Sequence, residues 1–221
     1  MEQGNTARAR RTKKRTRIQA LNDERILDAA LKVFSAYGFR GSTVDQIAER
    51  AGMSKPNLHY YFRRKRDLYV AVLNWTLDLW LRPLEEVDAN GDPEMEIRRY
   101  VETKMDLTRT HPQASRLFAS EILQGAPLLK PLLETRVRAL VDEKAALFRR
   151  WSEKGRLGAI DPYHLIFMIW AMTQHYADFA VQICAIKGVA RLDEAFFDEA
   201  KRNVLSLLSE GLRPRGHQRG R

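Results

Sequence analysis

The 221-residue sequence has little of what several protein classes need. Its one cysteine, Cys184, excludes an internal disulfide and a cysteine-based zinc site, which suits a reducing cytoplasm. The longest strongly apolar run, residues 165–172, is far shorter than the roughly 20 residues that cross a bilayer. No apolar stretch follows the charged N-terminus, so a secretory signal is not expected. We therefore expect a globular, cytoplasmic protein that does not insert into a membrane.

Enzyme motifs are also missing. The sequence contains no G-x-S-x-G, no H-E-x-x-H and no glycine-rich phosphate loop. His111, His164 and His175 stand singly in segments of helical pattern, where such residues usually pack or face water. We expect no catalytic residue, no metal site and no cofactor, and a binding protein rather than an enzyme.

Positive charge is plentiful and unevenly placed. The net charge is +10 and the pI is near 9.9, which favours a polyanionic partner such as nucleic acid. Seven positive charges lie in residues 8–17 and four in residues 213–221, which leaves the rest of the chain at −1. We predict a basic, flexible N-terminal arm over residues 1–19 and a basic tail over 213–221. The arm either follows DNA phosphates or the minor groove, or serves as a disordered solubilising tail, and both readings stay open.

Helix signals occur almost everywhere, and no segment has a convincing strand pattern, so the fold class is all-α with about nine helices. The first confident helix covers residues 22–38, with Asn22 or Asp23 as its cap and Gly38 as its stop. Later helices are expected over residues 66–88, 92–112, 112–125, 127–155, 162–187 and 192–212.

Two short helices between these segments share a tight turn. Thr43 can cap a helix over "VDQIAERA", Gly52 makes the turn, and Ser54 caps the next helix, with Pro56 in its first turn. A supporting helix followed by two short helices and a glycine turn is a helix-turn-helix, and it defines a DNA-binding domain over residues 20–66.

The second short helix would enter the major groove. Lys55 and Asn57, at its start, would face base edges, since asparagine pairs bidentately with adenine. Tyr60 and Lys65 would hold phosphates, and the N–H groups near Thr43 could bind another. Tyr61 is expected to pack against the first helix at least in part. The predicted DNA-binding residues are Thr43, Ser54, Lys55, Asn57, Tyr60, Tyr61 and Lys65.

The segment over residues 162–187 is apolar all round, which requires burial on both faces. One face would pack inside the subunit and the other against a second copy. Together with residues 192–212 it would form a four-helix interface, so we expect a homodimer through the last two helices.

A polar stripe runs along this apolar segment. Trp170, Gln174 and Asp178 are spaced by four and lie on one face. In one reading Gln174 and Asp178 hydrogen-bond neighbouring side chains or the other subunit. In the other, Trp170 is a stacking surface and Gln174 offers a donor and an acceptor to a planar lactam.

Residues 24–73 resemble the DNA-binding domain of TetR-family transcriptional regulators. The residues that carry the resemblance are Ala51, Gly52, Ser54, Tyr60, Tyr61, Phe62, Lys65 and Leu68. The resemblance implies a homodimer that binds a double-stranded operator, with a C-terminal helical domain, residues 67–212, whose small-molecule ligand changes operator affinity.

The segments "PQASRLFASEILQGAPLL", "DEKAALFRRW" and "IDPYHLIFMIWAMTQHYADFAVQI" are further similar to the regulators of pyrimidine utilisation within this family. This resemblance implies uracil or thymine as the ligand, held by Trp170, Gln174 and Trp80. Arg116 and Asp178 are further candidates, although an internal ion pair between them is an equal alternative. Two other readings stay open: a TetR-type regulator of a different small ligand, and an architectural DNA-binding protein without a ligand.

Overall fold

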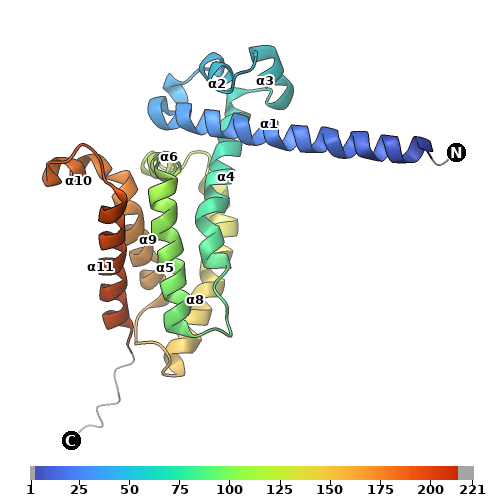
Figure 1. The fold of residues 1–221 in the computed structure, drawn as a ribbon. Coiled ribbons are helices and arrows are strands. Elements are labelled where there is room, and N and C mark those ends of the chain that lie inside the picture. Colours follow the sequence, from blue (N-terminus) through green and yellow to red (C-terminus); the bar gives the residue numbers. More distant parts are fainter. Residues whose placement is uncertain (1–2, 214–221) are drawn as a thin grey trace, which may run out of the picture. The chain divides into compact units, whose positions relative to one another are not determined.

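All regular structure of the computed structural model is helical over the residues that it describes, 3–213, with side chains from residue 21 onward (Figure 1). The chain forms two compact units, one ending at Trp75 and one starting at Thr76. We predicted a boundary after residue 66. Helix α4, Lys65–Glu85, runs through that position and also through the junction of the two units, so the boundary at residue 66 stays a prediction.

The first unit contains three helices and the beginning of α4. They are α1 Gln3–Gly41, α2 Val44–Arg50 and α3 Lys55–Tyr61. The buried side chains that hold them together are apolar, and the fully buried ones include Ile26, Phe34, Ile47, Leu58, Leu68 and Val72. At 25 cal/mol per Å² of apolar surface, each such side chain contributes about 1.5–3 kcal/mol to the stability of the unit.

Helix α1 is longer than predicted. Its backbone is helical from Gln3, so it includes most of the segment over residues 1–19 that we expected to be a flexible arm. Gly38, at the predicted helix stop, has a φ of 67° and kinks α1 there. The basic side chains of the arm, and all of the basic tail except Arg213, lie outside the described residues.

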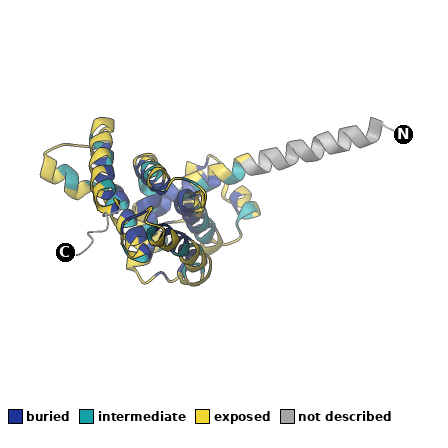
Figure 2. Cartoon of the chain, turned by 90° about the horizontal axis from the view of Figure 1, so that it is seen from below, coloured by how far each residue is buried: buried dark blue, intermediate teal, exposed yellow. Residues whose placement is uncertain are grey.

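The second unit is a helical bundle. After α4 its elements are α5 Pro93–Thr110, α6 Pro112–Leu123, α7 Lys130–Leu132, the π-helix η1 Leu133–Val137, α8 Arg138–Glu153, α9 Pro162–Asp178, α10 Ala180–Lys187 and α11 Glu194–Leu212. Helix α5 packs against α9 and α11, and α9 also contacts α6 and α8. Buried residues line the inner faces of these helices, whereas α10 is mainly exposed (Figure 2).

Aspartate caps begin three of these helices. Asp92, Asp161 and Asp193 each accept a hydrogen bond from the backbone N–H three residues later. Proline occupies the first helical position after Asp92 and Asp161, where its missing N–H has no cost. The Asp-Pro signals therefore correctly indicated the starts of α5 and α9.

Of two segments that we predicted as single long helices, one is continuous and one is divided. In residues 127–155, α7, η1 and α8 follow one another without a break, with a π-helical stretch in η1. Residues 162–187 are interrupted at Phe179, whose φ of −112° and ψ of 24° separate α9 from α10. Neither glycine nor proline marks this break, so sequence signals cannot reveal it. It follows directly after Asp178, whose carboxylate accepts a hydrogen bond from Ser115 of α6 at 2.6 Å.

The C-terminal end of α4 is held by a buried lysine from α8. The Lys144 ammonium group donates to the carbonyl oxygens of Glu85 at 3.1 Å and Val87 at 3.2 Å, and lies 3.2 Å from Glu143. A helix end leaves its last carbonyl groups without intrahelical donors, and a cation there also complements the helix dipole. Arg136 of η1 adds ion pairs to Asp78 and Glu85 of α4.

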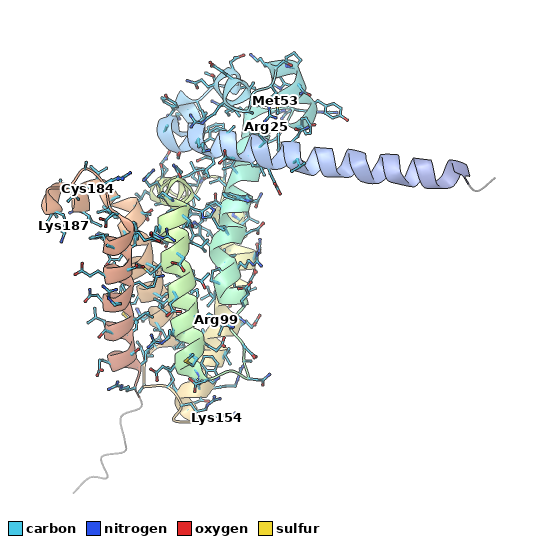
Figure 3. All side chains as sticks on the ribbon, in the orientation of Figure 1. Arg25, Met53, Arg99, Lys154, Cys184 and Lys187 are labelled. Atoms are coloured by element: carbon cyan, nitrogen blue, oxygen red, sulfur yellow. The ribbon has the colours of Figure 1, made fainter. Side chains whose placement is uncertain are left out.

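We expect Lys144→Met to lower the free energy of unfolding by about 1–3 kcal/mol, because it leaves the part-buried Glu85 carbonyl and the buried Val87 carbonyl without their donor. Urea unfolding followed by circular dichroism measures the change. Lys154→Met, at an exposed position after α8, is the matched control and should leave the urea midpoint unchanged (Figure 3). Equal midpoints for the two variants would contradict the role of Lys144.

Candidate functional sites

The turn between α2 and α3 is fixed to α1 by an arginine. Gly52 has a φ of 61°, a conformation that favours glycine. The Arg25 guanidinium group donates to the carbonyl oxygens of Ala51 at 2.5 Å and Gly52 at 2.8 Å. A Cβ at position 52 would lie 3.0 Å from the Arg25 Nη2 atom. Arg25 and Met53 of the turn lie close together in Figure 3. Sequence reasoning did not identify Arg25, since no local pattern links it to the turn.

The caps of both short helices form as predicted. The Thr43 hydroxyl accepts from the Gln46 N–H while the Gln46 side chain accepts from the Thr43 N–H, which is a capping box. The Ser54 hydroxyl accepts from the Asn57 N–H at 3.3 Å. Both hydroxyl groups therefore start helices, and both residues are exposed.

Helix α3 presents a polar face to solvent. Lys55, Asn57 and Tyr60 are exposed, with 66% of Tyr60 accessible, whereas Leu58 is buried against the unit's core. The Lys55 ammonium group lies 2.9 Å from the carboxylate of Asp45 on α2. Such an exposed ion pair contributes little to stability. The ion pair holds the Lys55 side chain beside α2, so a DNA phosphate would have to compete with Asp45 for the Lys55 ammonium group.

Tyr61 and Lys65 are both engaged within the first unit. The Tyr61 hydroxyl accepts a hydrogen bond from the Asn22 amide at 2.8 Å, so this tyrosine packs against α1 as expected. The Lys65 ammonium group donates to the carbonyl oxygens of Phe39 at 2.7 Å and Ser42 at 2.8 Å, and lies 4.7 Å from the centre of the Phe39 ring. The phosphate contact of Lys65 stays a prediction, and only its third N–H is left for one.

A second site is a cluster of polar side chains inside the otherwise apolar second unit. On α5, Tyr100 and Lys104 are one turn apart and both fully buried. The Trp170 indole of α9 donates to the Tyr100 hydroxyl at 2.6 Å. The Lys104 ammonium group lies 4.2 Å from the centre of the Trp80 ring of α4. Helix α5 therefore connects the two tryptophans that we predicted on either side of a ligand.

Burial changes the protonation behaviour of this cluster. Desolvation lowers the pKa of Lys104 to about 7, and attraction by Asp178 partly opposes it. Desolvation raises the pKa of Asp178, while Ser115 and the charges of Lys104, Arg116 and His175 lower it. The pKa of the Tyr100 hydroxyl is raised by burial, so it stays neutral. Lys104 can therefore gain or lose its charge near neutral pH.

Two polar atoms of α4 have no hydrogen-bond partner among the described residues. They are the Thr76 hydroxyl oxygen and the Trp80 indole nitrogen, and both are buried. Buried polar groups normally have a partner, so such exceptions call for an explanation. Helical spacing places Thr76 and Trp80 on the same face of α4. Sequence reasoning identified Trp80 but missed Thr76 and Lys104, because neither belongs to a recognisable motif.

The remaining predicted ligand residues occupy different surroundings. Trp170 and Gln174 are half-buried, and Trp170 packs against the core of the unit. Asp178 is bonded to Ser115, and no ion pair joins it to Arg116 in the described part of the chain. Arg116 is exposed and lines an open cleft of about 400 Å³ with Tyr176, Cys184 and Phe197.

Over residues 3–213 no helix has the length and apolar character that a membrane span requires. In the same range, no group of three or more histidine, cysteine, aspartate or glutamate side chains is arranged to hold a metal ion.

A glycine turn between two short capped helices, with an exposed polar face on the second, defines a DNA-binding protein of the helix-turn-helix class. Residues 26–72 match the tetR family of bacterial regulatory proteins, and residues 73–215 match the C-terminal region of YcdC-like proteins. The chain therefore belongs to the TetR family of transcriptional regulators. It is a ligand-responsive DNA-binding regulator and not an enzyme.

Individual relatives agree with this family. The chain is 50% identical to the HTH-type transcriptional regulator RutR of Escherichia coli strain K12 over 204 residues, which is 92% of this chain and 96% of RutR. It is 31% identical to the HTH-type transcriptional repressor NicS of Pseudomonas putida over 135 residues, 60% of this chain and 62% of NicS.

Solved structures show the same fold. A transcriptional regulator from Streptomyces coelicolor matches with a TM-score of 0.69 at 23% identity, over 87% of this chain and 98% of that one. AibR in complex with isovaleryl coenzyme A and operator DNA matches with a TM-score of 0.65 at 20% identity, over 85% and 97% of the two chains.

The two adjacent tyrosines of α3 should differ in their effects. Tyr61→Phe should lower the free energy of unfolding by about 1 kcal/mol, because it removes the acceptor of the Asn22 amide. Tyr60→Phe should leave stability unchanged and weaken binding to an operator obtained by in vitro selection, since its exposed hydroxyl suits a phosphate. Denaturant unfolding and fluorescence anisotropy measure the two quantities. Unchanged operator affinity for Tyr60→Phe would remove Tyr60 from the DNA contact.

Proposed function

We propose that this regulator binds a palindromic operator as a homodimer and is released or retuned by a pyrimidine such as uracil or thymine. The residues proposed to contact DNA are those named from the sequence, with Lys55 and Asn57 reading base edges and Tyr60 holding a phosphate. Trp80, Trp170 and Gln174 would bind the pyrimidine, and Asp178 and Arg116 would act at the edge of that site.

The observation that carries the ligand proposal is the buried indole N–H of Trp80, which has no acceptor among the described residues. A protein that bound no ligand would gain nothing from leaving this donor unsatisfied, because an unpaired buried polar group costs about 1–3 kcal/mol. The half-buried Gln174 carboxamide likewise makes no hydrogen bond with a described residue, and it offers an amino group that donates and a carbonyl oxygen that accepts. Both features disfavour a ligand-independent architectural protein.

The chemistry of the cluster favours a flat heterocycle that alternates N–H and C=O groups. Two indole rings offer stacking surfaces, and the amide of Gln174 can pair with such an edge. The 50% identity to RutR and the sequence resemblance to pyrimidine-utilisation regulators support uracil or thymine in particular. A TetR-type regulator with a different planar ligand is the alternative that these features leave open.

Helix α4 offers a route from ligand to DNA. Its first turns, from Lys65, belong to the first unit, and its later turns carry Thr76 and Trp80 in the second. A ligand that binds Trp80 better in one position of α4 than in another shifts the equilibrium between those positions. The coupling is typically about 1–3 kcal/mol and is reciprocal, so operator DNA must weaken pyrimidine binding by the same factor.

The dimer proposal rests on apolar side chains that the single chain leaves exposed. They lie along α9, α10 and α11 and include Phe167, Met168, Phe179, Val181, Ile186 and Leu207. Large exposed apolar patches of this kind mark protein interfaces. Along α11, Phe197, Val204 and Leu208 are buried within the unit's own core, whereas Leu207 is widely exposed and would face the second copy.

Gln174→Ala should abolish the response of operator binding to uracil while leaving operator affinity itself unchanged, because Gln174 lies in the second unit and outside the DNA-contacting helices. Uracil affinity by calorimetry should fall at least about tenfold, the effect of about 1.4 kcal/mol. Gln124→Ala, at an exposed glutamine that bonds Ser120 of its own helix, is the matched control. Unchanged uracil affinity of Gln174→Ala would reject the assignment.

Val181→Glu should convert the dimer to a monomer, because it places a charge on a side chain that is 85% exposed in the single chain and would be covered by the second copy. Light scattering after size-exclusion chromatography measures the mass. Operator affinity should fall with it, since one reading helix contacts only one half-site. Asn90→Asp adds the same charge in the exposed loop before α5 and should stay dimeric. A dimer of unchanged stability for Val181→Glu would exclude this surface.

A further inference from the structure

Three hydrogen-bond donors gather around Trp80 without an acceptor among the described side chains. The Thr76 hydroxyl is 0% exposed, Trp80 is 4% exposed with its indole N–H unpaired, and Lys104 is 1% exposed. The described part of the chain offers the Lys104 ammonium group no hydrogen bond. It contacts the face of the Trp80 ring at 4.2 Å and is attracted by the charge of Asp178.

These groups share one location. Thr76 and Trp80 are one turn apart on the same face of α4, and Lys104 of α5 lies over the Trp80 ring. Lysine and the indole N–H can only donate hydrogen bonds, and the threonine hydroxyl can donate as well as accept. A folded protein leaves such donors without partners rarely, so a bound group that accepts hydrogen bonds is the expected complement.

We infer that Thr76, Trp80 and Lys104 form an oxygen-binding subsite. In this subsite the ammonium group of Lys104 donates a hydrogen bond to an exocyclic carbonyl oxygen of the effector. The inference rests on the proposed function and specifies the ligand class within it. A carbonyl oxygen of the ligand accepts hydrogen bonds from the protein donors that face it. An exocyclic amino group of the ligand at the same place would instead point its own N–H groups at those donors. The subsite therefore selects a dioxo heterocycle over its amino counterpart.

The subsite also makes binding depend on pH. Burial holds the pKa of the unliganded Lys104 at about 7, and an oxygen that accepts from the ammonium group raises it. Below pH 7 the lysine is charged with and without ligand, so affinity is constant there. Above pH 7 binding must take up a proton, and affinity falls by up to about tenfold for each pH unit.

The charges around Lys104 come from few groups. Asp178 of α9 acts on it directly, and Arg116 of α6 and His175 of α9 act on Asp178. Tyr100, on the same helix as Lys104, stays neutral because burial raises its pKa. Thr76 and Trp80 of α4 do not titrate in this range. Lysine titration therefore dominates the expected profile above pH 7.

The test is calorimetry of the full-length protein with uracil and with cytosine at pH 6.5 and 8.5, in two buffers of different ionisation enthalpy. Uracil should bind at least about tenfold more weakly at pH 8.5, with proton uptake, and cytosine at least about tenfold more weakly than uracil at pH 6.5. Lys104→Met should weaken uracil binding and abolish the pH dependence and the proton uptake. Its melting temperature without ligand should exceed that of the unaltered protein, because a buried ammonium group has been removed.

Thr76→Val keeps the shape of the side chain and should weaken uracil binding while retaining the pH dependence, which provides a second test should Lys104→Met not fold. Uracil affinity that is equal at both pH values, or unaffected by Lys104→Met, overturns the subsite. If Gln174→Ala still abolishes the response in that case, the proposed pyrimidine function survives. No uracil binding by the unaltered protein at either pH overturns both.

Discussion

A buried ammonium group is the main electrostatic constraint on the interior of the second unit. Lys104 lies in the middle of α5, between apolar neighbours that include Val101 and Met105, where a charge without solvation is costly. The protein reduces that cost with the face of the Trp80 ring, the field of Asp178 and a pKa near neutrality. None of these gives the ammonium group a hydrogen bond within the described structure. A small molecule with a carbonyl oxygen could supply the missing acceptor.

Neighbouring positions on α5 show how the same problem is solved where no ligand is required. One turn before Lys104, the Tyr100 hydroxyl accepts from Trp170, and one turn after it, the Thr108 hydroxyl donates to the Thr173 carbonyl of α9 at 3.1 Å. These two bonds tie α5 to α9 on either side of Lys104. Only the middle position of the row lacks a hydrogen-bond partner in the described structure, which supports the binding role that we propose for Lys104.

The first unit follows a different principle, in which its polar groups bond other residues of the same unit. Thr43 and Ser54 start their helices, and Arg25 and Lys65 bind the carbonyl groups where α2 and α1 end. With these groups satisfied inside the unit, the exposed face of α3 is left for DNA. The Asp45 carboxylate beside Lys55 would weaken contacts with any phosphate, which favours sites where other interactions compensate.

Much of the secondary structure of the first unit was predictable, because the residues that start and end its helices lie close together in the sequence. Caps, a turn glycine and a proline at a helix start act within four residues, so the sequence indicated α2, the turn and α3. The break at Phe179 was not predictable, because no residue there has a strong helix-breaking propensity. Periodicity predicts that Phe197 and Leu208 are buried without showing by which chain. The core of the second unit buries both, and the dimer interface itself stays a prediction.

The sequence by itself determined the helical class and the helix-turn-helix, since both depend on composition, spacing or local motifs. Spacing also placed Trp170 on a polar stripe, whereas Trp80 became a candidate only through the resemblance to pyrimidine-utilisation regulators. Only the tertiary structure decided that Lys104 of α5 lies on the Trp80 ring of α4 and that Ser115 bonds Asp178. It also decided that the Thr76 hydroxyl and the Trp80 indole N–H have no hydrogen-bond partner among the described residues. The two contacts join residues that are 24 and 63 positions apart in the sequence, and the other observation is the absence of a hydrogen-bond partner among the described residues. Packing alone sets them, because no local preference of the backbone records which side chains meet.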